Sequence, residues 1–323
     1  MSALIERQKE LLDTKGLTES IRGCRVLVTG ANGFVGLHLC EALLGLNAEV
    51  HALSRSAERQ EFPSGIHRHS VDLKNITAVR KSIRKIRPDV VYNLAGLVNT
   101  RQYLSLVIPT LKNNLVGSVN LFLTLAEESC RRLIVVGSSE EPGAGRLGGI
   151  ASSPYAAAKE AETEYAKMFN SIFSMPVVVA RPFMSYGPRQ PVEKIIPYVI
   201  TSLLQERSPK ISSGRRVCDL IYIQDLVMGL ILSGFQSDLT GKAIDLGAGV
   251  GMTIKEAVCT IAALIPSSAK PEFGAIPDRL YEAPQIANSE ETFRLLGFRP
   301  LWSLKDGLEV TLEWYREHPE FYM

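Results

Sequence analysis

The sequence predicts an α/β protein with a doubly wound parallel sheet and a smaller C-terminal lobe. Between residues 24 and 180, short apolar runs rich in valine, leucine and isoleucine alternate with longer segments of helical periodicity. Strands that are apolar on both faces belong to parallel sheets covered by helices on each side. From about Pro182 onward the alternation loosens and prolines become frequent, which predicts shorter elements in a separate lobe.

The expected elements follow in order along the chain. Apolar residues at helical spacing over 2–14 predict an amphipathic helix that packs against the body or, alternatively, contacts a partner. The apolar runs predict strands at 25–29, 49–53, 89–95, 133–136 and 177–180, and helices at 36–44, 115–130 and 155–171. Two later strands are expected at 218–223 and 243–245. The chain then divides into an N-terminal helical extension (1–22), a sheet domain (23–181) and a C-terminal lobe (182–323), with chain exchange between the last two.

Composition and charge exclude several classes of protein. The 323 residues carry 36 Lys and Arg against 34 Asp and Glu, and a net charge of +2 is too balanced to indicate nucleic acid or an anionic membrane as partner. No apolar run reaches the roughly 18 residues of a membrane span, and charged residues interrupt the N-terminus where a signal peptide would be apolar. Five scattered cysteines without a CxxC pair indicate neither a disulfide framework nor a zinc site, so a cytoplasmic protein is expected. His67 and His69 are expected on a solvated strand face, and no metal site is predicted.

A glycine-rich turn joins the first strand to the first helix of the sheet. Its glycines allow a tight turn, let backbone N–H groups approach a pyrophosphate, and seat the helix closely on the sheet. A turn of the same composition without a ligand is the alternative. With the catalytic residues described below, the turn predicts that 23–181 binds a dinucleotide, with contacts from Gly30, Asn32, Gly33, Phe34, Val35 and Gly36.

The end of the second strand bears on the choice of dinucleotide. Where NAD-preferring sites place a carboxylate for the ribose hydroxyls, this chain has Ser54-Arg55-Ser56. An arginine and two hydroxyls bind a 2′-phosphate that a carboxylate would repel, which favours NADP over NAD. A solvated Arg55 without a ligand is the alternative. Asp72 and Leu73, after the third strand, are expected near the adenine amine, with a helix-capping role for Asp72 as the alternative.

A phenol and an ammonium are expected to lie together on one helix. Tyr155 and Lys159 are four residues apart, so their side chains lie one above the other on the same helix face. The ammonium stabilises the phenolate and lowers a pKa that is about 10 in free tyrosine. Ser138 follows the strand at 133–136, at the carboxyl edge where doubly wound sheets bind ligands. Together with the glycine turn, these residues predict hydride chemistry with Tyr155 as the group that transfers a proton.

These motifs resemble the extended short-chain dehydrogenase/reductases, in particular the NAD(P)-dependent epimerase/dehydratase branch that acts on nucleotide sugars. The resemblance covers about residues 24–315 and rests on the order and spacing of many short motifs. Beyond the glycine turn and YxxxK, they are Asn93-Leu-Ala-Gly96, Asn114-Leu-Val-Gly117, Arg181-Pro-Phe183, Tyr186-Gly-Pro188, Asp219-Leu-Ile-Tyr-Ile-Gln-Asp225 and Leu296-Gly-Phe-Arg-Pro300. The resemblance implies a Rossmann fold and an enzyme.

The resemblance also implies roles for individual residues. Tyr155 would take the hydroxyl proton of a sugar while the cofactor takes the hydride, which leaves a 4-keto intermediate. Ser138 matches the residue that holds the substrate oxygen, and Lys159 would also bind the nicotinamide ribose. Further cofactor contacts are implied for Leu94, Ala95, Gly96, Asn114 and Pro182.

Glu140 bears on the branch of the family. In 4,6-dehydratases and related decarboxylases a serine or threonine is followed two residues later by a glutamate, and Ser138 and Glu140 fit this pattern. Glu140 is then an acid/base at the neighbouring carbon; a solvent-facing glutamate is the alternative. The family usually continues with a hydrophobic residue and Tyr-Gly, whereas this chain has Glu141-Pro-Gly143.

A nucleotide diphosphate needs cationic partners, and several arginines are candidates. Arg216 and Arg279 are the preferred ones, because a guanidinium binds phosphate in two-pronged fashion. Arg189 and Lys194 are further candidates, and surface positions are the alternative for each. Cys218 stands where many relatives have an arginine. The sugar is expected to contact Asn99 and Ser139.

The leading hypothesis is an NADP-dependent nucleotide-sugar epimerase, with dehydration or reduction of a 4-keto sugar as alternatives. A reductase of a non-sugar ketone keeps the chemistry and changes the substrate. A non-catalytic dinucleotide-sensing protein is a different class, against which Ser138, Tyr155 and Lys159 argue. A homodimer is expected through the two helices that carry Asn114 and Tyr155, with apolar contacts from Leu121, Leu125, Ala158, Ala161 and Ala166.

Overall fold

A computed structural model describes residues 2–56, 62–142, 149–281 and 283–323. Its centre is a seven-stranded sheet in the order β10-β6-β5-β4-β1-β2-β3, and every pairing in it is parallel. The strands are β1 (Arg25–Thr29), β2 (Glu49–Ser54), β3 (His67–Ser70), β4 (Val90–Asn93), β5 (Arg132–Val136), β6 (Val177–Pro182) and β10 (Ala243–Leu246). The predicted doubly wound parallel sheet is therefore confirmed.

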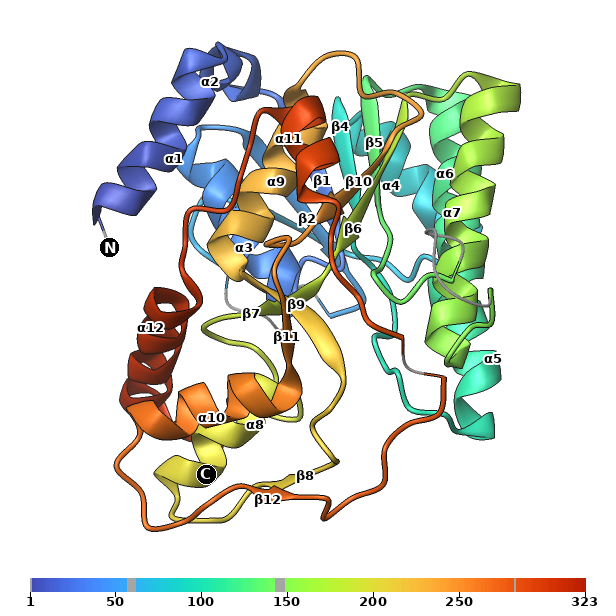
Figure 1. The fold of residues 1–323 in the computed structure, drawn as a ribbon. Coiled ribbons are helices and arrows are strands. Elements are labelled where there is room, and N and C mark those ends of the chain that lie inside the picture. The colour runs from blue at the N-terminus through green and yellow to red at the C-terminus, as the bar shows by residue number, and fades with distance from the viewer. Residues whose placement is uncertain (1, 57–61, 143–148, 282) are drawn as a thin grey trace.

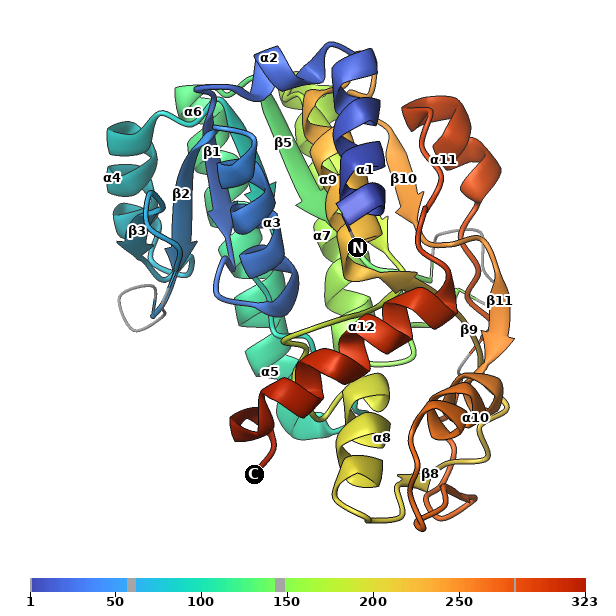
Figure 2. The ribbon, with the colours of Figure 1, turned by 90° about the vertical axis from the view of Figure 1, so that its left-hand side faces the viewer.

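Helices cover both faces of this sheet (Figures 1 and 2). On one face lie α3 (Phe34–Gly45) and α9 (Ile223–Phe235); on the other lie α4 (Ile76–Ile86), α6 (Gly117–Glu128) and α7 (Pro154–Phe173). Alternate residues of a strand point to opposite faces, so Val26 and Val28 of β1 belong to the first core while Leu27 belongs to the second. Continuous apolar strands are thus explained by two cores that share one sheet.

The strand order places a binding edge between β1 and β4. The chain runs outward from β1 to β2 and β3, then returns to β4 on the other side of β1. The loops that leave neighbouring strands at such a switch point diverge to opposite faces, and a crevice forms outside their carboxyl ends. The segments that follow Thr29 and Asn93, the last residues of β1 and β4, meet in this crevice.

The N-terminal segment forms two helices, α1 (Ser2–Thr14) and α2 (Leu17–Ile21). Leu12, Leu17 and Ile21 are buried and join the core on the α3 and α9 side of the sheet. The predicted helix over 2–14 is confirmed, and its C-terminal part packs against the body.

The remaining C-terminal elements form a lobe beneath the carboxyl ends of the strands (Figure 1). It has a three-stranded sheet, β11-β9-β7, and a short pair, β12-β8. Its elements are β7 (Met184–Tyr186), α8 (Ile195–Leu204), β8 (Lys210–Ile211), β9 (Val217–Tyr222), β11 (Gly251–Thr253), α10 (Ile254–Leu264), β12 (Glu272–Phe273), α12 (Leu304–Glu317) and η4 (Pro319–Phe321). Between α10 and α12 the chain returns to the main sheet, where α11 (Ser289–Leu296) packs against β10 and α9. The strand expected at 243–245 does not belong to this lobe, because β10 pairs with β6 at the edge of the main sheet.

The helix expected at 115–130 begins earlier than predicted. Helical structure runs from η2 (Leu104–Leu106) through α5 (Val107–Thr110) and a π-helical segment, η3 (Leu111–Val116), into α6. Two consecutive asparagines, at 113 and 114, interrupt the apolar periodicity there, which hides the earlier turns from a pattern search. Among the described residues no helix is long and apolar enough to cross a membrane.

Candidate functional site

The glycine turn forms a backbone-lined cradle between β1 and α3. Gly30 has φ +65°, and a Cβ there would lie 2.8 Å from the Ala95 nitrogen. A Cβ on Gly36 would lie 2.4 Å from the Gly30 carbonyl oxygen. Both obstacles are backbone atoms that cannot move aside, so only glycine fits. Since α3 has no acidic residue in its first turn, the positive end of its dipole stays available to an anion. The cradle fits the pyrophosphate of a dinucleotide.

The end of β2 lies against the cradle. The Asn32 amide donates to the Ser56 hydroxyl at 3.1 Å. Ser70 donates to the backbone oxygen of Arg55 at 3.0 Å, which fixes the backbone while the Arg55 side chain stays exposed. Ser54 is buried, and its hydroxyl has no hydrogen-bond partner among the residues that the structure describes. These residues would surround the adenosine ribose of a dinucleotide in the cradle.

Asp72 and Leu73 follow β3 and have different surroundings. The Asp72 carboxylate accepts the Lys74 N–H at 3.0 Å. The cap of α4 is instead Asn75, whose side chain accepts the Ala78 N–H at 3.1 Å. The alternative of a helix-capping Asp72 is therefore wrong. Leu73 is buried beside Gly117 at the start of α6, where a Cβ would lie 3.2 Å from the Leu73 Cβ.

Asn114 secures the loop after β4. From the π-helical segment, its side-chain oxygen accepts the Leu97 N–H at 2.7 Å and its amide donates to the Leu97 carbonyl at 3.3 Å. Residues 94–96 lie in this loop, and the Ala95 N–H donates to the Thr29 hydroxyl at 3.2 Å, against the end of β1. Pro182, at the end of β6, accepts the Ser139 N–H at 3.0 Å. The residues named after β1, β4, β5 and β6 thus line one edge of the sheet.

Tyr155 and Ser138 meet at this edge. The first turn of α7 is set by the Ser153 hydroxyl, which accepts the Ala156 N–H at 3.1 Å, and by Pro154 at the first helical position. Tyr155, in that turn, is hydrogen-bonded to the Ser138 side chain. Burial raises the pKa of the Tyr155 phenol, and the ammonium of Lys159 and the Ser138 bond oppose that rise only in part. The Lys159 ammonium thus lowers the pKa of Tyr155 as expected, but in the chain alone burial outweighs this effect and the net pKa is raised.

Lys159 is buried and paired with Glu162, one turn further along α7. The Nζ–Oε2 distance is 2.5 Å. Burial alone lowers the pKa of Lys159, but Glu162, with smaller contributions from Tyr155 and Glu141, opposes this effect and the net pKa is raised. The other Glu162 oxygen accepts the Asn93 amide at 2.9 Å and the Ser118 hydroxyl at 2.7 Å. Burial raises the pKa of Glu162, and these three partners oppose the rise.

A second polar group connects the end of β5 to the lobe. The Arg216 guanidinium lies 2.8 Å from a Glu140 oxygen and donates to the Gln285 side-chain oxygen at 3.0 Å. Gln285 also accepts the Ser139 hydroxyl at 3.1 Å. The Glu140 N–H donates to the Ser138 hydroxyl at 3.1 Å. This bond connects the residues around Arg216 to Ser138, the neighbour of Tyr155. Glu140 faces an arginine rather than open solvent.

Of the other candidate cations, Arg279 and Lys194 contact the same loop after β4, whereas Arg189 lies elsewhere. Arg279 donates to the Thr100 hydroxyl at 2.7 Å, beside the loop after β4, where the Asn99 side chain accepts the Arg101 N–H. Lys194 donates to the Val98 carbonyl at 3.4 Å, in the same loop. Arg189 pairs with Glu41 of α3 at 2.6 Å instead of joining the group around Tyr155.

Comparison with known proteins identifies the family. Residues 26–247 match the profile of the NAD dependent epimerase/dehydratase family, which is more than half of the chain. The chain belongs to this family. The expectations of an extended short-chain dehydrogenase/reductase and of an enzyme are confirmed at that level, and the family is NAD dependent.

Relatives match along most of their length. UDP-glucose 4-epimerase of Mycolicibacterium smegmatis is 25% identical over 90% of this chain and 98% of its own. UDP-glucuronic acid decarboxylase 1 of Xenopus tropicalis is 28% identical over 92% and 73%. Among solved structures, UDP-glucuronic acid 4-epimerase of Bacillus cereus, in complex with UDP-glucuronic acid and NAD, aligns with a TM-score of 0.80, 25% identity and coverage of 90% and 99%. Mth375, an epimerase of Methanothermobacter thermautotrophicus, aligns at 0.85 with 23% identity and 96% coverage of both chains.

This member of the family differs from the usual motif at Glu141. The carboxylate is fully buried; one oxygen accepts the Ser138 N–H at 2.7 Å and the other accepts Nε of Arg181 at 2.9 Å. Burial raises the pKa of Glu141, and Arg181 and the Ser138 N–H oppose the rise. A charged residue at a position that is usually hydrophobic was the available signal. The Glu141 side chain holds the backbone of Ser138. Gly143, which also differs from the usual family motif, lies outside the described residues.

Sequence reasoning missed several residues that the structure brings to the site. Glu162 and Gln285 were not named at all, and they contact the predicted residues Lys159 and Ser139. Asn93 and Arg181 were named only within family motifs, and they contact Glu162 and Glu141. For Glu162 the available signal was its position three residues after Lys159, which puts both side chains on one helix face. No local pattern marks Gln285, which is 146 positions from Ser139.

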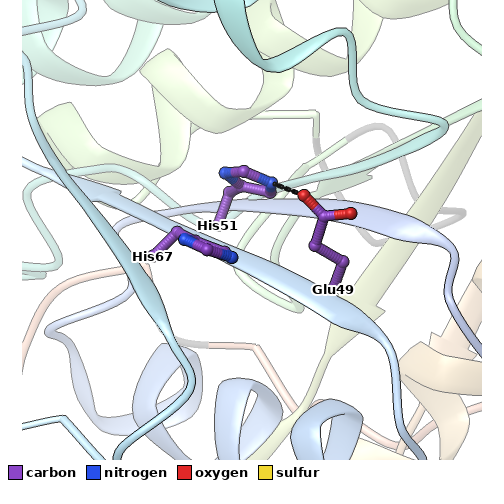
Figure 3. A group of neighbouring side chains, drawn as sticks. All are labelled: Glu49, His51 and His67. Atoms are coloured by element: carbon purple, nitrogen blue, oxygen red, sulfur yellow. Dashed lines mark hydrogen bonds and ion pairs between the residues drawn. The ribbon is translucent and has the colours of Figure 1, made fainter.

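A group of three possible metal ligands lies at the other end of β2 (Figure 3). Glu49 and His51 come from β2 and His67 from β3, and their ligand atoms lie within 4.8 Å of one another. A Glu49 oxygen is 3.0 Å from Nε2 of His51, and Nδ1 of His51 is 2.9 Å from Nε2 of His69. Burial lowers the pKa of His69 to about 4. The expected solvated face is thus only partly right, because His67 is exposed while His69 is half-buried against His51.

Proposed function

We propose that this protein converts a nucleotide-linked sugar through a transient 4-keto intermediate, by epimerisation or by dehydration. The hydrogen bond between Tyr155 and Ser138, at the sheet edge that also carries the glycine cradle, is the observation that carries this proposal. The relatives support the class of substrate, since their names refer to UDP-glucose and UDP-glucuronic acid.

In this mechanism each residue acts on a stated atom. Tyr155 removes the proton of the sugar hydroxyl, and Ser138 donates to the same oxygen and fixes its position. Lys159 supplies the charge that favours the phenolate. Glu141 holds the backbone of Ser138 through its bond to the Ser138 N–H. The nicotinamide supplies the acceptor for the hydride when it is bound.

Glu140 and Arg216, which form an ion pair, are the residues that we assign to the sugar end of this arrangement. A carboxylate two residues after Ser138 is positioned as an acid/base for the carbon next to the ketone, which favours dehydration or decarboxylation as the step that follows oxidation. Arg216 and Arg279 are the proposed contacts of the diphosphate, and Asn99 and Ser139 those of the sugar. Contact with a phosphate requires Arg216 to exchange or share its contact with Glu140, 2.8 Å away.

We propose NADP as the preferred cofactor. The Arg55 side chain is exposed next to the glycine cradle, where Asn32 is hydrogen-bonded to Ser56. A guanidinium at this position would bind a 2′-phosphate. Arg55→Ala is expected to weaken NADP binding at least tenfold while NAD binding changes little, measured by titration of protein fluorescence. Equal loss for both dinucleotides would contradict this assignment.

A homodimer through α6 and α7 remains a proposal, with different contacts from those expected. Leu121, Leu125, Ala158 and Ala166 are buried inside the subunit, so they are not available to a partner. Exposed apolar side chains on the same helical layer are Val107, Leu111, Val116 and Leu123. Sedimentation of the protein gives its mass directly, and a monomer at micromolar concentration would contradict the dimer.

The reaction is tested with a panel of nucleotide sugars, with reduced cofactor and product mass as the two readouts. No net change in mass means epimerisation, loss of water means dehydration, and a gain of two hydrogens means reduction. Tyr155→Phe is expected to lower kcat by about 10²–10⁴-fold while cofactor affinity stays within about threefold. Tyr165→Phe, on the exposed face of the same helix, is the matched control. Full activity in Tyr155→Phe would refute the proposed proton carrier.

A further inference from the structure

Lys159 is a buried ammonium whose charge has to be balanced by the protein. It is 5% exposed, and a lysine so far from water is stable as a cation only beside an opposite charge. Glu162 is 0% exposed, lies on the same helix face, and its Oε2 is 2.5 Å from the Lys159 Nζ.

The position of Glu162 is fixed by residues from other elements. Its second oxygen accepts from Asn93, the last residue of β4, and from Ser118 of α6. Asn93 in turn accepts the Thr29 hydroxyl at 2.7 Å, and Thr29 accepts the Ala95 N–H beside the cradle. One line of buried hydrogen bonds therefore joins the end of β1, the end of β4 and the lysine on α7.

We propose that Glu162 is a positioning residue for this reaction: its carboxylate keeps the Lys159 ammonium charged and fixed beside the Tyr155 phenol. This inference rests on the proposed function, because it needs Tyr155 as the proton carrier. Glu162 is fully buried and its carboxylate is bonded to Lys159, Asn93 and Ser118, so it would act on the reaction through its charge and through the position of Lys159.

Two other carboxylates, Glu141 and Glu140, also act on the pKa values of Lys159 and Tyr155, and their effects must be separated from that of Glu162. Glu141 raises the pKa of Lys159 from the β5 side, but its own carboxylate is bonded to Arg181. Glu140 raises the pKa of Tyr155 and is paired with Arg216. Glu162 is thus the carboxylate in direct contact with Lys159 among the described ion pairs, and it also raises the pKa of Tyr155.

Removal of the Glu162 charge is expected to lower the pKa of both Lys159 and Tyr155. Without the carboxylate, burial lowers the pKa of Lys159, so the ammonium is lost at a lower pH. The pKa of Tyr155 falls as well while the ammonium persists, because a negative charge that opposes the phenolate is gone. Both limbs of the pH profile of kcat therefore move to lower pH in Glu162→Gln, by on the order of one to three units for the alkaline limb.

The experiment measures kcat from about pH 5 to about pH 11.5 for the full chain with its cofactor and a turned-over nucleotide sugar, because the raised pKa of Lys159 puts the alkaline limb of the parent above the ordinary lysine range. Glu164→Gln is the matched control, since Glu164 pairs with Lys167 at the same spacing on the same helix but is exposed, and it should leave the profile unchanged. Glu162→Asp keeps the charge one methylene further away and should move the alkaline limb in the same direction by less. If Glu162→Gln does not fold, a shift in the Asp variant supports the inference.

A folded Glu162→Gln or Glu162→Asp variant with the parent pH profile would overturn the inference, even if its kcat were lower at every pH. That result differs from failure of the proposed function, which would appear as activity retained in Tyr155→Phe.

Discussion

Asp219 fixes the lobe through three backbone N–H groups. Its carboxylate is 1% exposed; one oxygen accepts the Ala248 N–H at 2.7 Å, and the other accepts the Gly249 N–H at 2.8 Å and the Ala287 N–H at 3.0 Å. These donors come from two segments far from Asp219 in the sequence. Asp219→Asn keeps the shape of the side chain and replaces one acceptor oxygen with an NH₂ group.

The magnitude follows from the three contacts. Whichever way the new amide is turned, its NH₂ group faces at least one of the backbone N–H groups, which is left without an acceptor. A hydrogen bond to a charged group contributes about 1.5–3 kcal/mol, and the bonds that remain become weaker because the acceptor is neutral. Burial raises the pKa of Asp219, so keeping its carboxylate charged in the folded protein costs free energy. This cost reduces the contribution of the charge to stability near neutral pH. We expect the free energy of unfolding to fall by about 2–4 kcal/mol.

Urea denaturation followed by fluorescence of the two tryptophans measures this loss. Asp238→Asn is the control, because Asp238 is exposed and its φ of +60° is one that asparagine also adopts. A loss below about 0.5 kcal/mol at unchanged denaturant slope would refute the reasoning. Since Ala287 lies two residues after Gln285, the variant should also raise KM more than it lowers kcat.

Gly36→Ala is expected to abolish cofactor binding in a titration, because its Cβ would lie 2.4 Å from a backbone oxygen of the cradle. Gly45→Ala at the end of the same helix meets no atom within 4 Å and should keep full affinity, so equal affinity in both variants would contradict the cradle geometry. The pKa of His69 is lowered to about 4, so folding favours its neutral form and stability is lost as pH falls from about 6.5 toward 4. His69→Gln should flatten that part of a plot of Tm against pH; an unchanged slope would show that His69 is not the titrating group.

Much of the fold was predictable because its strands are apolar on both faces. The runs at 25–29, 133–136 and 177–180 became β1, β5 and β6 within a residue or two at each end. The catalytic positions were predictable because Tyr155 and Lys159 share one helix face and Ser138 ends a strand. These are local relations, which spacing along a chain expresses directly.

The rest depends on contacts between distant segments. Nothing near Glu162 indicates that Asn93 and Ser118 will enclose its carboxylate, and a glutamate in a helix is ordinarily solvated. Leu121 and Leu125 illustrate the opposite error: their apolar character fits a dimer contact and a subunit core equally well, and only the packing of α6 on the sheet decides. The effect of Lys159 on the pKa of Tyr155 was predictable in direction, but the larger opposing effect of burial was not, since the burial of the phenol is set by the whole fold.

The pairing of β10 with β6 has a consequence for how this chain can be divided. A fragment that ends near residue 182 would leave Val179 and Ala180 at an open edge, with the backbone groups that β10 normally engages facing water. An exposed strand edge can pair with the same edge of another molecule. A fragment that ends near residue 182 is therefore expected to aggregate when expressed by itself, rather than to bind a dinucleotide as an independent domain. During synthesis on the ribosome, the outermost strand joins only after some sixty further residues have emerged, and the nascent edge needs protection until then.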